Sequence, residues 1–179
     1  MSTRDLLRSL KALTGTAPGP LPEDPPARAE DLFLTWLEEA IAAGVPEPHA
    51  MTLSTLGTDG VPDARVLILK DVDARGWAFA STASSTKGLQ LAAAPAAALT
   101  FWWPQVVRSV RVRGRVVEAD AAESRADLAA RSASARAEVA DGDWRLWRVV
   151  PDAVEFFQGS PDRRHARLVY EASGSLRRC

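Results

Sequence analysis

Apolar positions recur with a helical period near the start of the chain. They lie three or four residues apart, at Phe33, Trp36, Leu37, Ala40 and Ile41. This spacing places the five side chains on one face of a helix. Gly44 follows as a stop signal, because glycine is common just past the last turn of a helix. The pattern predicts an amphipathic helix that packs against a core.

The rest of the chain contains short apolar runs separated by turn residues, which predict strands. Their ranges are 51–56, 65–70, 77–81, 97–103, 107–117, 147–150, 154–158 and 166–171. Shorter helices are expected at 4–13, 86–93 and 121–130, with Asp120 as the N-cap of the last. Residues 71–76 are interpreted as a turn, and 132–142 as a weak helix or loop. This succession predicts a mainly β fold, an antiparallel β-barrel with flanking helices.

Two segments carry a further expectation. The strand at 65–70 is apolar on both faces, which predicts burial on both sides. Five prolines between Thr14 and Pro26 predict an extended linker after the first helix. We therefore divide the chain into an N-terminal helix and linker, residues 1–26, and one barrel domain, residues 27–179.

Charge and cysteine content exclude several classes of protein. A formal net charge of −1 argues against a general nucleic-acid binder. The single cysteine, Cys179, excludes an intramolecular disulfide, and with only two histidines a Cys/His metal site is not expected. No segment resembles a signal peptide or an apolar run long enough to span a membrane, so neither is expected. We expect a cytoplasmic protein without a nucleic-acid or membrane partner.

The most informative chemistry lies near the C-terminus. A short strand containing Phe156 and Phe157 runs into a Gly-Ser-Pro-Asp turn, and the returning strand carries Arg163, His165 and Arg167. Because strand side chains alternate between faces, these three are expected to project to one side. Such a face suits a flat anionic ligand. A solvated edge strand protected by its charges is the alternative interpretation.

Two motifs resemble a known family. Residues 155–167 are similar to the C-terminal signature of the pyridoxamine 5'-phosphate oxidase family, E-F-W-Q-G followed by a turn and R-x-H-D-R. Residues 65–70 resemble the R-x-x-L-L-K strand of the same family. Its members are FMN-binding split-barrel flavoproteins that form homodimers with the flavin at the subunit interface. The resemblance implies the same fold, cofactor and assembly for this chain.

The resemblance also implies residue roles. Arg65 and Lys87 would hold the FMN phosphate, with a hydroxyl from Ser81. The full set of matching flavin contacts is Arg65, Val66, Leu67, Ile68, Lys70, Ser81, Thr82, Lys87, Ser109, Phe157 and Arg167. The substrate would meet Lys70, Arg131, Arg163 and His165. Arg163 and His165 would act as the catalytic pair while a hydride passes from a CH–N or CH–OH carbon to flavin N5, and dioxygen would reoxidise the flavin.

Several positions depart from the family pattern. Phe157 replaces a tryptophan, Ser109 a glutamine, Asp127 a tyrosine and Ala135 a serine, and a segment is missing before Trp144. The last two substitutions remove hydroxyls from the substrate's phosphate pocket and add a carboxylate, which repels a phosphate. We expect weak activity on phosphorylated B6 vitamers. A flavin or deazaflavin reductase acting on a different small molecule, and a non-catalytic flavin-binding protein, remain alternatives.

Overall fold

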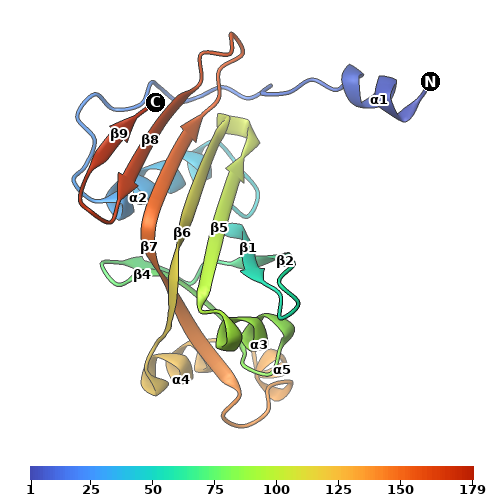
Figure 1. Ribbon diagram of the computed structural model, residues 1–179, viewed down its shortest axis with the longest axis vertical. Coiled ribbons are helices and arrows are strands. Elements are labelled where there is room, and N and C mark those ends of the chain that lie inside the picture. Colours follow the sequence, from blue (N-terminus) through green and yellow to red (C-terminus); the bar gives the residue numbers. More distant parts are fainter.

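The computed structural model describes residues 1–179, and its ribbon is dominated by long antiparallel strands (Figure 1). The strands are β1 Ala50–Leu56, β2 Pro62–Ile68, β3 Asp71–Asp73, β4 Gly76–Thr82, β5 Ala96–Trp103, β6 Arg108–Glu118, β7 Trp144–Gln158, β8 Ala166–Glu171 and β9 Leu176–Arg178. The helices are α1 Thr3–Ser9, α2 Ala29–Ala42, α3 Thr86–Ala93, α4 Ala121–Ala129 and α5 Ala133–Ala137, with a 3-10 turn, η1, at Pro104–Val106. The mainly β prediction is confirmed.

All strands belong to one antiparallel sheet in the order β2-β1-β5-β6-β7-β4-β3, with β8 paired to β7 and β9 to β8. The prediction of two strands at 147–150 and 154–158 was wrong, because β7 continues through Pro151. The register of β6 against β7 shifts between Arg113 and Gly114, and this shift is a β-bulge that accommodates Pro151. A Cβ on Gly114 would lie 2.0 Å from the Val150 carbonyl oxygen, so only glycine fits there.

Helix α2 closes the core on one side of the sheet, as its apolar spacing predicts. Phe33 and Trp36 are 0% and 1% exposed. The Phe33 ring lies 4.9 Å from that of Phe101 on β5, and the Trp36 ring lies 5.1 Å from that of Phe156 on β7. Burying each such aromatic side chain stabilises the fold by about 1.5–3 kcal/mol, so α2 is firmly held on the barrel.

Strand β2 is less covered than its sequence suggests. It pairs only with β1, and Val66 is 68% exposed in the single chain. The expectation of burial on both sides is therefore wrong for one copy of the protein, because no second layer covers the outer face of this edge strand. Residues 71–73, interpreted as part of a turn, form the short strand β3 instead.

The N-terminal segment runs along the barrel before reaching α2 (Figure 1). The Thr16 amide donates to the Gln105 carbonyl oxygen at 2.9 Å, and the Tyr170 hydroxyl donates to the Pro26 carbonyl oxygen at 2.9 Å. Helix α1 lies away from the sheet with every residue exposed. The division at residue 26 stays a prediction. No helix is both long and apolar enough to cross a membrane.

Candidate functional site

Arg65 on β2 and Lys87 in the first turn of α3 form a cationic cluster. The Arg65 guanidinium donates to Thr55 Oγ1 at 2.5 Å, to Gln90 Oε1 at 3.0 Å and to Asp63 Oδ2 at 2.5 Å. These bonds fix the guanidinium between β1, β2 and α3. No local sequence pattern identifies Thr55 and Gln90 as partners, because both are distant from Arg65 along the chain.

Lys87 is the less compensated of the two cations. Its ammonium donates to Ser85 Oγ at 3.3 Å and makes no ion pair with a carboxylate. Burial, and then the nearby charge of Arg65, lower the pKa of Lys87 from its ordinary value. A bound anion would oppose both effects, since an opposite charge favours the protonated ammonium. The cluster therefore fits the phosphate of a mononucleotide.

The loop before α3 adds hydroxyls to this cluster. Ser85 caps the helix, accepting from the Gly88 amide at 3.3 Å, and its Oγ lies 3.3 Å from Ser81 Oγ. Thr82 is the last residue of β4, directly before this loop, and its carbonyl oxygen accepts from Ser85 Oγ at 2.7 Å. Helix N-termini and hydroxyls favour anions. Ser81, Thr82 and Lys87 thus lie together, as the family resemblance implies.

A second cluster lies beside the first, where β4 pairs with β7. Lys70 Nζ lies 3.9 Å from Asp127 Oδ1, and the Trp144 indole donates to Asp127 Oδ2 at 2.8 Å. The Arg131 guanidinium lies 4.4 Å from the centre of the Trp144 ring. Thr82 is directly opposite Trp144 in the β4–β7 register, so this cluster borders the loop before α3. Ala135 lies outside it, on α5, where its amide donates to the Ser132 cap.

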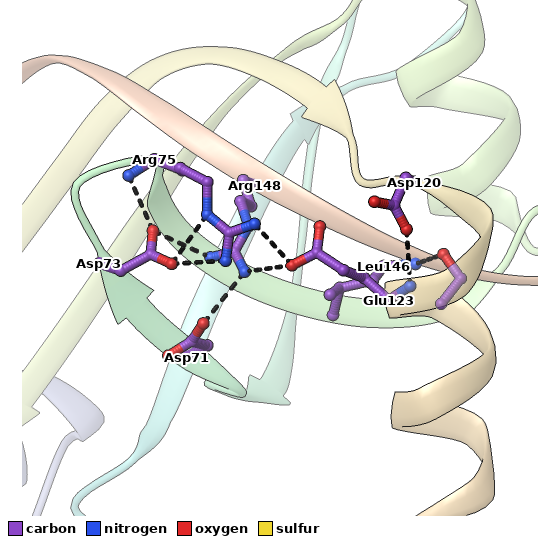
Figure 2. Close-up of polar contacts among 8 residues, drawn as sticks. Asp71, Asp73, Arg75, Asp120, Glu123, Leu146 and Arg148 are labelled. Carbon is purple, nitrogen blue, oxygen red and sulfur yellow. Dashed lines mark hydrogen bonds and ion pairs between the residues drawn. The ribbon is translucent and has the colours of Figure 1, made fainter.

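An ion network holds α4, which carries Asp127 and is followed by Arg131, against the sheet (Figure 2). The buried Arg148 on β7 lies 3.0 Å from Asp71, 3.3 Å from Asp73 and 3.0 Å from Glu123. Arg75 lies 2.6 Å from Asp73 and 2.8 Å from Glu123. Because Asp71 directly follows Lys70 and Glu123 lies one turn before Asp127, the network sets the separation of that pair. Arg148 was not predicted as a structural residue, because its only signal in the sequence is a charge inside an apolar strand.

A third, aromatic cluster lies at the other end of β7. Ser109, Phe157 and Arg167 occupy directly opposed positions on β6, β7 and β8. The His165 ring centre is 5.3 Å from that of Phe157, and the Arg167 guanidinium is 5.0 Å from the same ring. His165 Nδ1 accepts from the Ser160 amide at 3.0 Å, so Nε2 carries the proton of the neutral ring. This cluster presents an aromatic surface with cations at its edge.

The prediction that Arg163, His165 and Arg167 alternate along a strand was wrong for Arg163 and His165, which both precede the strand. Strand β8 begins only at Ala166, and Arg163 lies in the preceding turn with a φ of 64°. Its amide donates to the Ser160 carbonyl oxygen at 3.0 Å, which closes the turn. Arg163 is exposed at the tip of the loop, so the strand alternation does not determine its direction.

The clusters do not meet within one chain. Trp144 and Phe157 lie near opposite ends of β7, separated by about 40 Å of strand at roughly 3.3 Å per residue. Figure 1 places α4 and the β7–β8 loop at opposite ends of the molecule. The structure therefore brings Arg65, Ser81, Thr82 and Lys87 together and places Lys70 and Arg131 beside them. It separates these residues from Arg163 and His165.

Two family models match the chain. The model described as pyridoxamine 5'-phosphate oxidase covers residues 37–158, and the model of the pyridoxine 5'-phosphate oxidase C-terminal dimerisation region covers residues 144–177. The chain belongs to the pyridoxamine 5'-phosphate oxidase family. The pyridoxine/pyridoxamine 5'-phosphate oxidase of Thermosynechococcus vestitus is 40% identical over 173 residues, covering 79% of this chain and 82% of that protein.

Solved structures of other proteins share the fold of this chain. PhzG from Burkholderia lata, in complex with tetrahydrophenazine-1-carboxylic acid, superposes with a TM-score of 0.83 and 26% identity over 92% of this chain and 98% of that one. A pyridoxamine 5'-phosphate oxidase-related, FMN binding protein from Nostoc punctiforme gives a TM-score of 0.69 and 16% identity over 88% of this chain and 97% of that one. The predicted split-barrel fold is confirmed.

Proposed function

We propose that this protein is an FMN-dependent oxidase that resembles pyridoxine/pyridoxamine 5'-phosphate oxidase and acts as a homodimer. When bound, FMN supplies the redox chemistry that removes a hydride from a CH–N or CH–OH carbon, with dioxygen as the final acceptor. The observation that carries the proposal is the Arg65–Lys87 cluster, two cations with one partly buried ammonium that has no carboxylate partner. The curated oxidase relatives support the same reaction class.

The fold around that cluster supports a proposed position for the cofactor. Arg65 and Lys87 would bind the phosphate with Ser81 and Thr82, while the β2 strand from Val66 to Ile68 would lie along the ring. The exposure of Val66 at 68% leaves this strand accessible in the single chain. Charged hydrogen bonds to phosphate contribute about 1.5–3 kcal/mol each, so the phosphate end should dominate cofactor affinity.

A second copy of the chain would complete the site. Residues 144–177, which match the dimerisation model, contain Phe157, Arg163, His165 and Arg167. In a homodimer these side chains, with Ser109, can approach the flavin held by the partner. This arrangement would also cover the outer face of β2. It accounts for the distance between the clusters without any rearrangement of β7.

The aromatic cluster would orient the substrate. Phe157 offers an apolar face, His165 offers a donor at Nε2, and the Arg163 guanidinium can bind an anionic or carbonyl oxygen. Holding the reacting carbon close to the flavin is the main contribution that such residues make to the rate. Arg163 and His165 are therefore proposed as the catalytic pair.

The cofactor assignment is tested with Lys87→Met, since Lys87 makes few structural contacts. Unmodified protein should bind FMN more tightly than riboflavin, and the variant should lose about 2 kcal/mol of FMN affinity with little change for riboflavin. Fluorescence titration measures both ligands, and sedimentation reports the dimer. Equal affinity for the two flavins would contradict the assignment of Arg65 and Lys87 as the FMN phosphate site. A bound flavin that no B6 vitamer reduces anaerobically would favour a reductase on another substrate or a non-catalytic protein.

A further inference from the structure

The carboxylate of Asp127 lies in the second cluster, with Lys70, Arg131 and Trp144, next to the proposed flavin strand. It is held from two sides, by the Lys70 ammonium at 3.9 Å and by the Trp144 indole N–H at 2.8 Å. The Asp127 side chain is only 15% exposed, and that of Lys70 is 29% exposed. The carboxylate is therefore part of the local structure and does not swing freely in solvent.

The pairing changes which cation is available to a ligand. Lys70 is already compensated by Asp127, whereas Arg131 forms no ion pair and stacks on Trp144. Arg131 Nε is buried without a hydrogen-bond partner. A buried donor left unpaired is costly, so this nitrogen favours an acceptor from a ligand. The cluster of Lys70, Asp127 and Arg131 thus has one uncompensated positive charge.

We propose that Asp127 makes the site selective for a substrate whose anionic group here is a single negative charge, such as a ring carboxylate. This rests on the proposed function, in which Lys70 and Arg131 face the substrate. A phosphate ester carries up to two negative charges, and each is repelled by Asp127 at short range. A dianion also gains twice the attraction to Lys70 and Arg131, but its desolvation cost grows with the square of its charge, so a cluster with one net positive charge compensates a monoanion better.

The experiment uses the FMN-loaded protein and two probes, inorganic phosphate and benzoate. Changes in the flavin absorption report binding of each probe, and anaerobic reduction by pyridoxamine 5'-phosphate reports productive binding. The unmodified protein should bind benzoate more tightly than phosphate. Asp127→Asn removes the charge and keeps an oxygen for the Trp144 indole. It should increase phosphate affinity at least tenfold and change benzoate affinity less than threefold.

Two further variants distinguish the effect of the Asp127 charge from a disturbance of the local structure. Asp141→Asn removes a negative charge from an exposed aspartate that makes no ion pair, and it should leave both affinities unchanged. If Asp127→Asn does not fold, Asp127→Ser also supplies an oxygen acceptor and carries the same expectation. In anaerobic reduction, Asp127→Asn should lower the concentration of pyridoxamine 5'-phosphate giving half the maximal rate at least tenfold.

The outcomes distinguish this inference from the proposed function. Failure of the unmodified protein to bind FMN overturns the proposed function and the inference with it. An FMN-loaded protein that binds phosphate more tightly than benzoate overturns the inference alone. So does an Asp127→Asn variant whose phosphate affinity equals that of the unmodified protein.

Discussion

Replacement of Arg148 should destabilise the protein far more than replacement of its neighbour Arg75. The Arg148 side chain is 4% exposed and forms ion pairs with Asp71, Asp73 and Glu123. Arg148→Met preserves most of the apolar stem but leaves Asp73 and Glu123 with Arg75 alone and Asp71 without an ion-pair partner. Arg75 shares Asp73 and Glu123, but its side chain is 57% exposed. Arg75→Met is therefore a matched control for burial.

The expected magnitude follows from this burial. Removing one member of a fully buried ion pair costs about 3–5 kcal/mol. The three carboxylates are 49%, 33% and 28% exposed, so water compensates part of the loss. We expect Arg148→Met to lower the free energy of unfolding by about 2–3 kcal/mol, and Arg75→Met by at most about 1 kcal/mol. For a chain of this size the first loss lowers Tm by about 4–12 °C.

Urea unfolding followed by circular dichroism measures both variants, and its pH dependence adds a second test. Hydrogen bonds from Arg75, then the charges of Arg148 and Arg75, lower the pKa of Asp73 below its ordinary value. A carboxyl whose pKa is lower in the folded than in the unfolded protein stabilises the fold at pH values above its unfolded pKa. This contribution is lost as the pH falls through the folded pKa. In Arg148→Met, the free energy of unfolding should therefore fall less steeply than in the unmodified protein as the pH drops below about 4. Equal destabilisation by Arg148→Met and Arg75→Met would refute the burial argument.

Four further outcomes are expected. Arg65→Ala should weaken FMN binding by about 2 kcal/mol in a fluorescence titration, and it should also lower Tm because Thr55 and Gln90 lose their partner. Arg163→Ala and His165→Ala should retain FMN but slow its anaerobic reduction by substrate, and loss of flavin from a folded variant would contradict this division. FMN affinity should fall as alkaline pH deprotonates Lys87, earlier than for an ordinary lysine because its pKa is lowered, and Lys87→Met should abolish that dependence. Gly114→Ala should reduce stability by several kcal/mol in urea unfolding, because its methyl group would meet the Val150 carbonyl; a loss under about 1 kcal/mol would show that the bulge adapts.

Local patterns predicted most elements of the fold. The apolar spacing identified α2, the range 86–93 coincides with α3, and Asp120 caps α4 by accepting from the Glu123 amide at 2.8 Å. These features depend on neighbours within a few residues. Pro151 was misleading because a proline usually interrupts a strand, whereas here a bulge opposite Gly114 accommodates it. Strand β3 was not predicted because two of its three residues are aspartates, which are rare in strands.

The candidate site was predictable in its parts but not in its arrangement. The motifs around Arg65 and His165 indicated the cationic and aromatic clusters. The separation of the two clusters depends on β7 being one continuous strand, whereas the apolar pattern predicted two strands there. The Asp127 partners Lys70 and Trp144 are distant along the chain, so no local spacing indicated that a carboxylate occupies the middle of the cluster.

The continuous strand β7 also has a consequence for how the protein folds as it is synthesised. β7 pairs with β4, β6 and β8, so both β4 and β6 have an open edge until residues 144–158 have left the ribosome. Pairings between segments far apart in sequence form slowly, and unpaired edges invite association with other chains. A nascent chain that stalls before Trp144 therefore exposes two unpaired strand edges, and the barrel cannot close until residues 144–158 have been synthesised.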